Sequence, residues 1–136
     1  MFDMDSNTPQ NFNAAIELAE SRNFGVAYSN QAFEYWLILH FEDHQGGPRQ
    51  RSDYNAKLNG YINPLGAHYD GGTNKRVEPE LFALLNCTDP KTGNTRISQA
   101  IQSARRNYNK FDHRSPALEE SSTTVFRLVE EILRFI

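Results

Sequence analysis

The first 30 residues contain two short strand patterns separated by one helix pattern, and this order restricts the fold more than any other feature. Residues 1–5 alternate apolar and acidic side chains, and residues 26–29 form a second strand-like stretch. Over residues 11–22, the apolar side chains recur at helical spacing. They are Phe12, Ala15, Ile16 and Ala19. The order predicts an α/β fold built on a βαβ unit, with parallel strands and a right-handed connection.

The length of 136 residues fits a single domain over 1–136. We expect residues 1–44 to form its core and metal site, and residues 45–136 to supply loops and helices that pack on it. A lone cysteine, Cys87, excludes a disulfide framework. Because no apolar run reaches the roughly 18 residues of a membrane span and the N-terminus is acidic, we predict a cytoplasmic protein with no membrane partner.

A mainly helical part is expected after the βαβ unit. Helices are predicted over 31–41, 53–62, 78–86, 96–110 and from Ser121 or Ser122 to 135, with glycine-containing loops over 44–52 and 63–75. The helix predicted over 31–41 follows two good capping residues, Ser29 and Asn30. It is apolar nearly all round, which predicts a buried position. The last carries an inward-facing apolar stripe of Val125, Leu128, Val129, Ile132 and Leu133.

Charge is distributed unevenly along the chain. Residues 1–44 hold seven acids and one base, whereas residues 45–117 hold eleven bases and six acids. An acidic head beside a basic middle suits a metal site next to a surface that attracts an anion. The alternative is ordinary charge scattered over the surface.

Asp3 and Asp5 are the first candidates for chemistry. Two carboxylates at i and i+2 point to the same face of a strand, and at its end both can reach one hard cation. Ligands of such units gather at the carboxyl ends of the strands. The pair therefore predicts a Mg²⁺ or Mn²⁺ site suited to phosphate-ester chemistry, with a solvated strand end as the alternative.

Two stretches resemble a known family. The run Ser29–Phe41, together with Phe2-Asp3-Met4-Asp5, is similar to the signature of RloB-like proteins, which are bacterial defence-associated proteins with a TOPRIM-type catalytic domain. The resemblance implies a TOPRIM-like Rossmannoid core and a metal-dependent nuclease of anti-phage defence. It also implies that Ser29 and Asn30 either contact the metal ligands or bind a phosphate group. Gln31 departs from the family, which has proline there.

The resemblance also implies a strand and a glutamate before the Asp-x-Asp strand, but only Met1 and Phe2 precede Asp3. We therefore expect a truncated TOPRIM-like domain. Glu34, one turn into the next helix, is the nearest substitute as a third catalytic residue beside Asp3 and Asp5. The alternative is a surface or salt-bridged glutamate, which needs a charged partner because most of its neighbours on the helix are apolar. His40, on the apolar face of that helix, is either a core histidine or, with Ser29 and Asn30, a residue that contacts the metal ligands or binds a phosphate.

Basic residues in or beside the two loops predict contact with DNA or RNA. They are Arg49, Arg51, Lys57, Lys75 and Arg76, interleaved with Tyr54, Tyr61 and Tyr69, whose rings could stack on bases. A second basic cluster comprises Arg105, Arg106, Lys110 and Arg114. Ordinary surface charge is the alternative for both.

Two other functions stay open. The chain could be an inactive fragment, or an interaction or nucleic-acid-binding module whose open sheet edge pairs with a partner or a second copy. Phe-Asp-Met-Asp also resembles the first motif of haloacid-dehalogenase-type phosphatases, although that motif continues with Gly-Thr and Ser6-Asn7 follows here.

Overall fold

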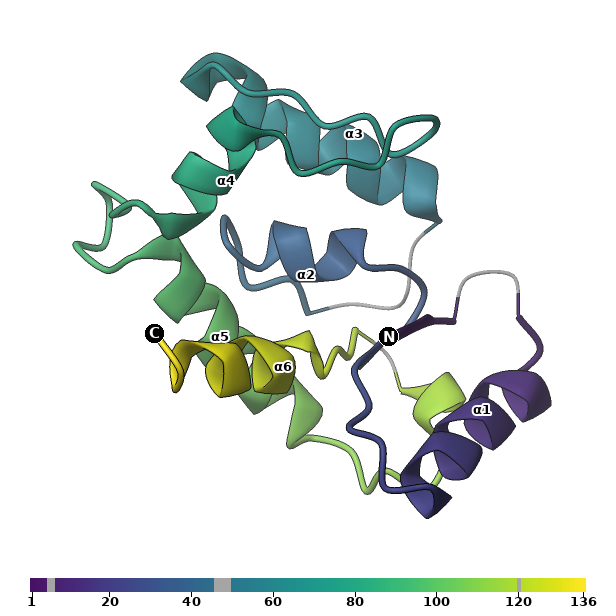
Figure 1. Cartoon of the computed structure of the whole chain (residues 1–136). Coiled ribbons are helices and arrows are strands. Elements are labelled where there is room, and N and C mark those ends of the chain that lie inside the picture. Colours follow the sequence, from purple (N-terminus) through teal and green to yellow (C-terminus); the bar gives the residue numbers. More distant parts are fainter. Residues whose placement is uncertain (5–6, 46–49, 120) are drawn as a thin grey trace.

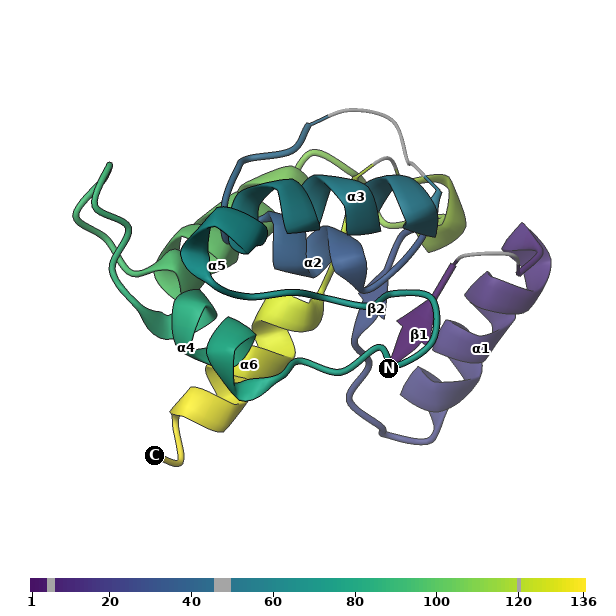
Figure 2. The same cartoon turned by 90° about the horizontal axis from the view of Figure 1, so that it is seen from above.

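The computed structural model describes residues 1–4, 7–45, 50–119 and 121–136. Strand β1 (Phe2–Asp3) pairs in parallel with β2 (Tyr28–Ser29), and helix α1 (Pro9–Ser21) connects them. In both views, α1 lies on one side of the strand pair, and the helices α2 (Glu34–Ile38) and α3 (Arg51–Ile62) lie on the other (Figures 1 and 2). This arrangement confirms a mixed α/β fold with parallel strands, although each strand is shorter than predicted.

Local sequence explains where α1 begins and ends. The Thr8 hydroxyl accepts a hydrogen bond from the backbone of Asn11 at 3.2 Å, and Pro9 occupies the first turn. Phe12 and Ile16 are buried, as their spacing predicts. Asn23 then takes a left-handed conformation, with φ of 61°, which ends the helix.

The central helix α2 spans only Glu34–Ile38, and all of its residues are buried. The prediction of a helix over 31–41 capped by Ser29 and Asn30 is wrong in its bounds and its cap. Gln31 has φ of 70°, so the helix starts only after this left-handed residue. The side-chain amide of Asn30 instead donates to the carbonyl oxygens of Pro116 and Ala117, at 3.0 and 2.9 Å.

The other predicted helices are present, with shifted ends. They are α3 (Arg51–Ile62), α4 (Pro79–Asn86), α5 (Arg96–Tyr108) and α6 (Val125–Leu133), with short 3₁₀ turns η1 (Asn63–Leu65) and η2 (Pro116–Leu118). Helix α3 starts two residues earlier than predicted, so that Arg51 is its first residue. It packs against α2, and α5 packs on α2, α4 and α6 (Figure 1).

The segment before α6 covers the outer side of β2. Ser29 forms an antiparallel bridge with Thr123, and the Asn30 backbone donates to the carbonyl of Ser122 at 2.8 Å. Within the described ranges, β1 has no strand neighbour except β2. None of the described helices is both long and apolar enough to cross a membrane.

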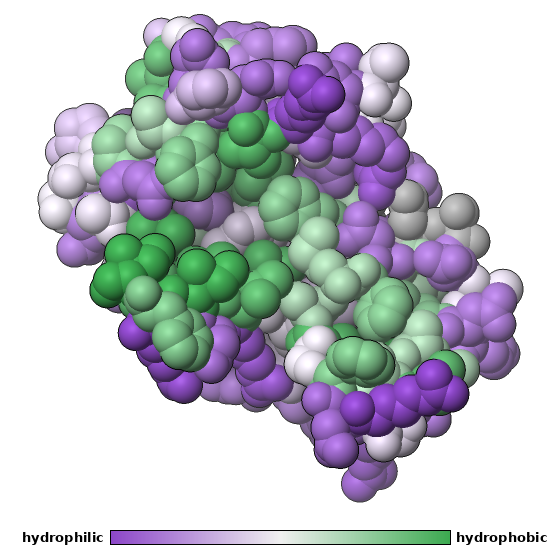
Figure 3. Space-filling model, in the orientation of Figure 1, coloured by the Kyte–Doolittle hydropathy of each residue, from purple (hydrophilic) through white to green (hydrophobic). Residues whose placement is uncertain are grey.

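Only part of the predicted apolar stripe of α6 faces the core. Val125 is buried, but Leu128, Ile132 and Leu133 are 44%, 52% and 47% exposed. Figure 3 shows apolar side chains gathered on the surface over this helix. Val129 is partly buried and packs against the core, so the first half of α6 contributes to the core, whereas the apolar side chains of its second half remain largely exposed.

Candidate functional site

Arg51 joins two carboxylates that come from different elements. Its Nη2 atom lies 3.1 Å from Oδ2 of Asp3, at the end of β1, and its Nε atom lies 3.3 Å from Oε2 of Glu34, the first residue of α2. Glu34 is only 2% exposed, whereas Asp3 and Arg51 are each 24% exposed. The site therefore has a buried end at Glu34 and an accessible end at Asp3, at the carboxyl end of β1.

Tyr69 holds the second oxygen of Glu34. Its hydroxyl donates to Oε1 at 3.0 Å. Burial, and then the nearby carboxylate, raise the pKa of Tyr69 well above its usual value, so the hydroxyl keeps its proton. Asn59 of α3 fixes the position of Tyr69, because its side chain accepts from the Tyr69 amide at 2.8 Å and donates to the Tyr69 carbonyl at 2.7 Å.

This role of Tyr69 was not predicted. The prediction that Tyr54 and Tyr69 stack on bases is wrong, because these side chains are 0% and 2% exposed. Tyr61 is 37% exposed and its ring already stacks on Phe41. No local signal identifies Tyr69 as a partner of Glu34, since the pair is 35 residues apart.

Two of the described side chains are candidate donors for a hard divalent cation. Asp3 and Glu34 supply two carboxylates at one place, and Mg²⁺ binds through one or two carboxylates completed by water and phosphate oxygens. Asp5, the second predicted metal ligand, lies outside the described residues. Among the described residues, no group of three histidine, cysteine or acidic side chains could hold a metal ion. A cation here would share both carboxylates with Arg51.

Three of the predicted site residues are buried and form hydrogen bonds inside the fold. They are Ser29, Asn30 and His40, each at most 1% exposed. The Ser29 hydroxyl shares a hydrogen bond with that of Thr123 at 2.8 Å. The His40 Nδ1 atom donates to the Trp36 carbonyl at 3.1 Å, and burial lowers the pKa of His40 to about 4. His40 lines an apolar groove next to α6, not the pocket that Arg51 lines.

The basic residues predicted to bind nucleic acid do not form one surface. Arg51 and Lys75 line the same pocket. Lys57 instead forms a salt bridge with Glu42 at 2.8 Å. Arg76 lines a different pocket, and Arg49 lies outside the described residues.

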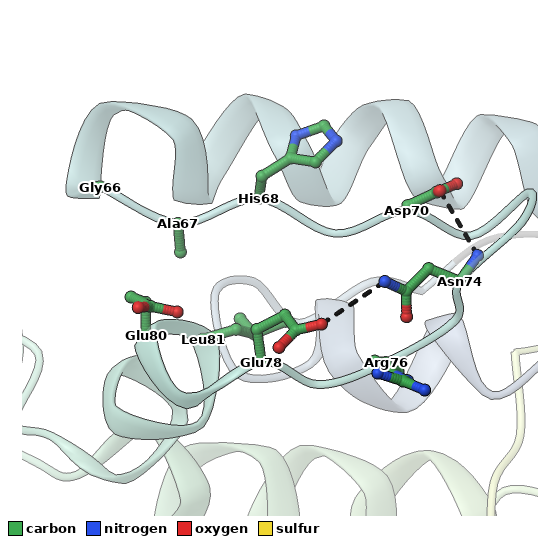
Figure 4. A pocket seen from close by; sticks show the side chains of 9 residues that line it. All are labelled: Gly66, Ala67, His68, Asp70, Asn74, Arg76, Glu78, Glu80 and Leu81. Atoms are coloured by element: carbon green, nitrogen blue, oxygen red, sulfur yellow. Dashed lines mark hydrogen bonds between the residues drawn. The ribbon is translucent and has the colours of Figure 1, made fainter.

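The pocket that contains Arg76 has mixed charge (Figure 4). It has a volume of 460 Å³ and also includes Asp70, Glu78 and Glu80. The amides of Thr73, Gly72 and Asn74 donate to the Asp70 carboxylate and lower its pKa. Because three acids surround one arginine, this pocket does not favour an anion.

The second basic cluster is bound to polar and acidic partners of the chain itself. Its contacts are Arg105 with Glu130, Arg106 with Asp43, Lys110 with Gln45 and Arg114 with Asp112. These contacts are exposed and match the alternative of ordinary surface charge.

Comparison with known proteins gives one finding. No curated protein and no solved structure shows significant similarity to the chain. The family model described as RloB-like protein matches residues 1–132, which include β1, α2 and the residues around Arg51. The chain therefore belongs to the RloB-like protein family.

Proposed function

We propose that this RloB-like chain is a divalent-metal-dependent nuclease domain of the TOPRIM type, acting in the cytoplasm as part of bacterial anti-phage defence. One observation carries the proposal. Asp3 and Glu34 meet on the Arg51 guanidinium at the carboxyl end of β1, which is where α/β folds bind their ligands. The family membership agrees with it.

In this proposal Asp3, with Asp5, and Glu34 hold Mg²⁺ or Mn²⁺. When bound, the cation polarises a phosphodiester and lowers the pKa of a water molecule. Tyr69 fixes the orientation of Glu34 by donating to one of its oxygens. Arg51 keeps the buried Glu34 charge paired when no cation is present, since an unpaired buried carboxylate is costly.

Calorimetric titration with Mn²⁺ tests the metal site. We expect Asp3→Asn and Glu34→Gln each to weaken Mn²⁺ binding by roughly tenfold or more, as loss of one charged ligand does. Asp112→Asn is the matched control, because Asp112 is 71% exposed and pairs with Arg114 away from this site. Equal affinity of all four proteins for Mn²⁺ would overturn the proposed metal site.

A second candidate is a nucleic-acid-binding module without cleavage. The observation in its favour is that both carboxylates already form salt bridges with Arg51. One assay, which measures binding and cleavage of labelled DNA and RNA strands in the presence of Mn²⁺, distinguishes the two candidates. Cleavage that is lost in Asp3→Asn supports the nuclease, whereas binding without cleavage supports the module. Among the described residues nothing favours the haloacid-dehalogenase-like alternative, whose second aspartate would be Asp5.

A further inference from the structure

A pocket lined by polar residues and glycines adjoins the Arg51 site. It has a volume of 350 Å³ and lies between the start of α3 and the turn formed by residues 70–75. Its lining comprises Arg51, Ser52, Asn55, Gly71, Gly72 and Lys75. Two of these side chains are cations and none is an acid, which distinguishes this pocket from the Arg76 pocket with its three acids.

The two cations differ in how they are held. Arg51 faces the pocket and also contacts the carboxylates of Asp3 and Glu34. Lys75 is exposed and forms no salt bridge with any residue in the part of the chain that the structure describes. An anion in the pocket would therefore gain the charge of Lys75 without displacing an internal partner.

The turn that carries Lys75 is held in one conformation. Oδ1 of Asp70 accepts from the amides of Gly72 and Thr73, both at 3.0 Å, and the Lys75 amide donates to the Asp70 carbonyl at 2.6 Å. Lys75 itself has φ of 54°, a left-handed conformation that is unfavourable for a lysine. These contacts therefore keep Lys75 beside the pocket at a cost in backbone energy.

Gly71 keeps the pocket open on the α3 side. Its amide donates to Oδ1 of Asn55 at 2.8 Å, which ties the turn to α3. A Cβ atom at position 71 would lie 2.8 Å from the same oxygen, closer than real Cβ contacts. Any larger residue would therefore have to displace the Asn55 side chain, which accepts the hydrogen bond from the Gly71 amide.

We propose that this pocket binds one phosphate group of a nucleic-acid strand between Lys75 and Arg51. The inference rests on the proposed function for the identity of the strand, but it needs no metal. Lys75 supplies a point charge, and Arg51 supplies planar donors while it contacts the two carboxylates. In this arrangement Arg51 would contact both Asp3 and the bound phosphate, which would be the phosphate next to the scissile bond.

The test is a titration of the full chain against a fluorescein-labelled 12-nucleotide oligothymidylate in EDTA, followed by fluorescence anisotropy. We expect Lys75→Ala and Gly71→Ala to weaken binding by roughly fivefold to tenfold, and Lys75→Ala to lower the salt dependence by about one counterion. Lys91→Ala and Gly60→Ala are the matched controls. Lys91 is an exposed lysine of another turn, and a Cβ atom added at Gly60 would have no other atom within 4 Å.

Inorganic phosphate, added at constant ionic strength, is expected to compete with the strand. Equal binding by Lys75→Ala and the unaltered chain, an equal loss in Lys91→Ala, or no competition by phosphate would each overturn the proposal. Thermal unfolding of Gly71→Ala shows whether that variant is folded, and Lys75→Ala tests the pocket independently of it. Because EDTA removes divalent ions, the binding titration does not depend on the metal site. The phosphate pocket can therefore be confirmed or overturned even if the proposed metal-dependent cleavage is not observed.

Discussion

The Tyr69 hydroxyl donates to Oε1 of Glu34 at 3.0 Å, in a place where neither side chain is more than 2% exposed. A loop residue and the first residue of the central helix therefore share one buried polar contact. An exposed counterpart exists in the same protein, where Tyr61 donates to Oε1 of Glu42 at 3.1 Å. The two contacts have the same chemistry and differ in burial.

Tyr69→Phe is expected to lower the free energy of unfolding by about 1.5–3 kcal/mol, because it removes a buried hydrogen bond to a charged group. Tyr61→Phe is expected to cost less than about 1 kcal/mol, because water replaces its exposed contact. Urea denaturation measures both. Equal losses would contradict the assigned burial of the Glu34 oxygen.

Arg51 and Glu34 are expected to be energetically coupled. In a double-mutant cycle of Arg51→Met and Glu34→Gln, the double variant should lose about 1–2 kcal/mol less than the sum of the single variants, because each single change removes a partner of the other group. The partly exposed pair Lys57 and Glu42, neither of which is buried as Glu34 is, provides the control cycle with Lys57→Met and Glu42→Gln, and its coupling should stay below about 0.5 kcal/mol. Strict additivity at Arg51 and Glu34 would show that their contact contributes nothing.

His40 is expected to make stability depend on pH. Burial lowers the pKa of His40 to about 4 from 6.5, so the unfolded chain binds more protons than the folded chain between these values. This contribution to the free energy of unfolding is complete above pH 6.5 and is lost as the pH falls toward 4, by about 3 kcal/mol. Urea denaturation at several pH values should show a shallower decline for His40→Gln. The same substitution at the exposed His68 is the control, and a decline unaltered in His40→Gln would contradict the prediction.

Helix α6 is expected to tolerate truncation on its apolar face. Ile132 is 52% exposed, whereas Ile38 of α2 is fully buried. Ile132→Ala should cost less than about 1 kcal/mol, and Ile38→Ala about 2–5 kcal/mol, because it leaves a cavity. Thermal or urea unfolding of the two variants makes the comparison. A large loss for Ile132→Ala would show that this face is covered in solution.

Much of the fold follows from local sequence. The βαβ unit was predictable because Phe12 and Ile16 recur at helical spacing. Its helix was expected over 11–22, but α1 begins two residues earlier, at Pro9, because Thr8 caps it. The bounds of α2 were not predictable from such signals. Asn30 has a side chain suited to capping, but it binds the carbonyl oxygens of Pro116 and Ala117, which are 86 and 87 residues away.

The candidate site divides in the same way. The sequence by itself determined that Asp3 lies on a parallel strand and that Glu34 lies on the helix after the second strand, because strand order and helical periodicity are local properties. The structure then showed that β1 ends at Asp3 and that α2 begins at Glu34. Only the tertiary structure decided that Arg51, 48 residues from Asp3, lies between the two carboxylates, and that Tyr69 is a buried donor and not an exposed ring. The physical reason is that a buried carboxylate must be paired, and which distant side chain pairs with it depends on how α3 and the following loop pack against α2.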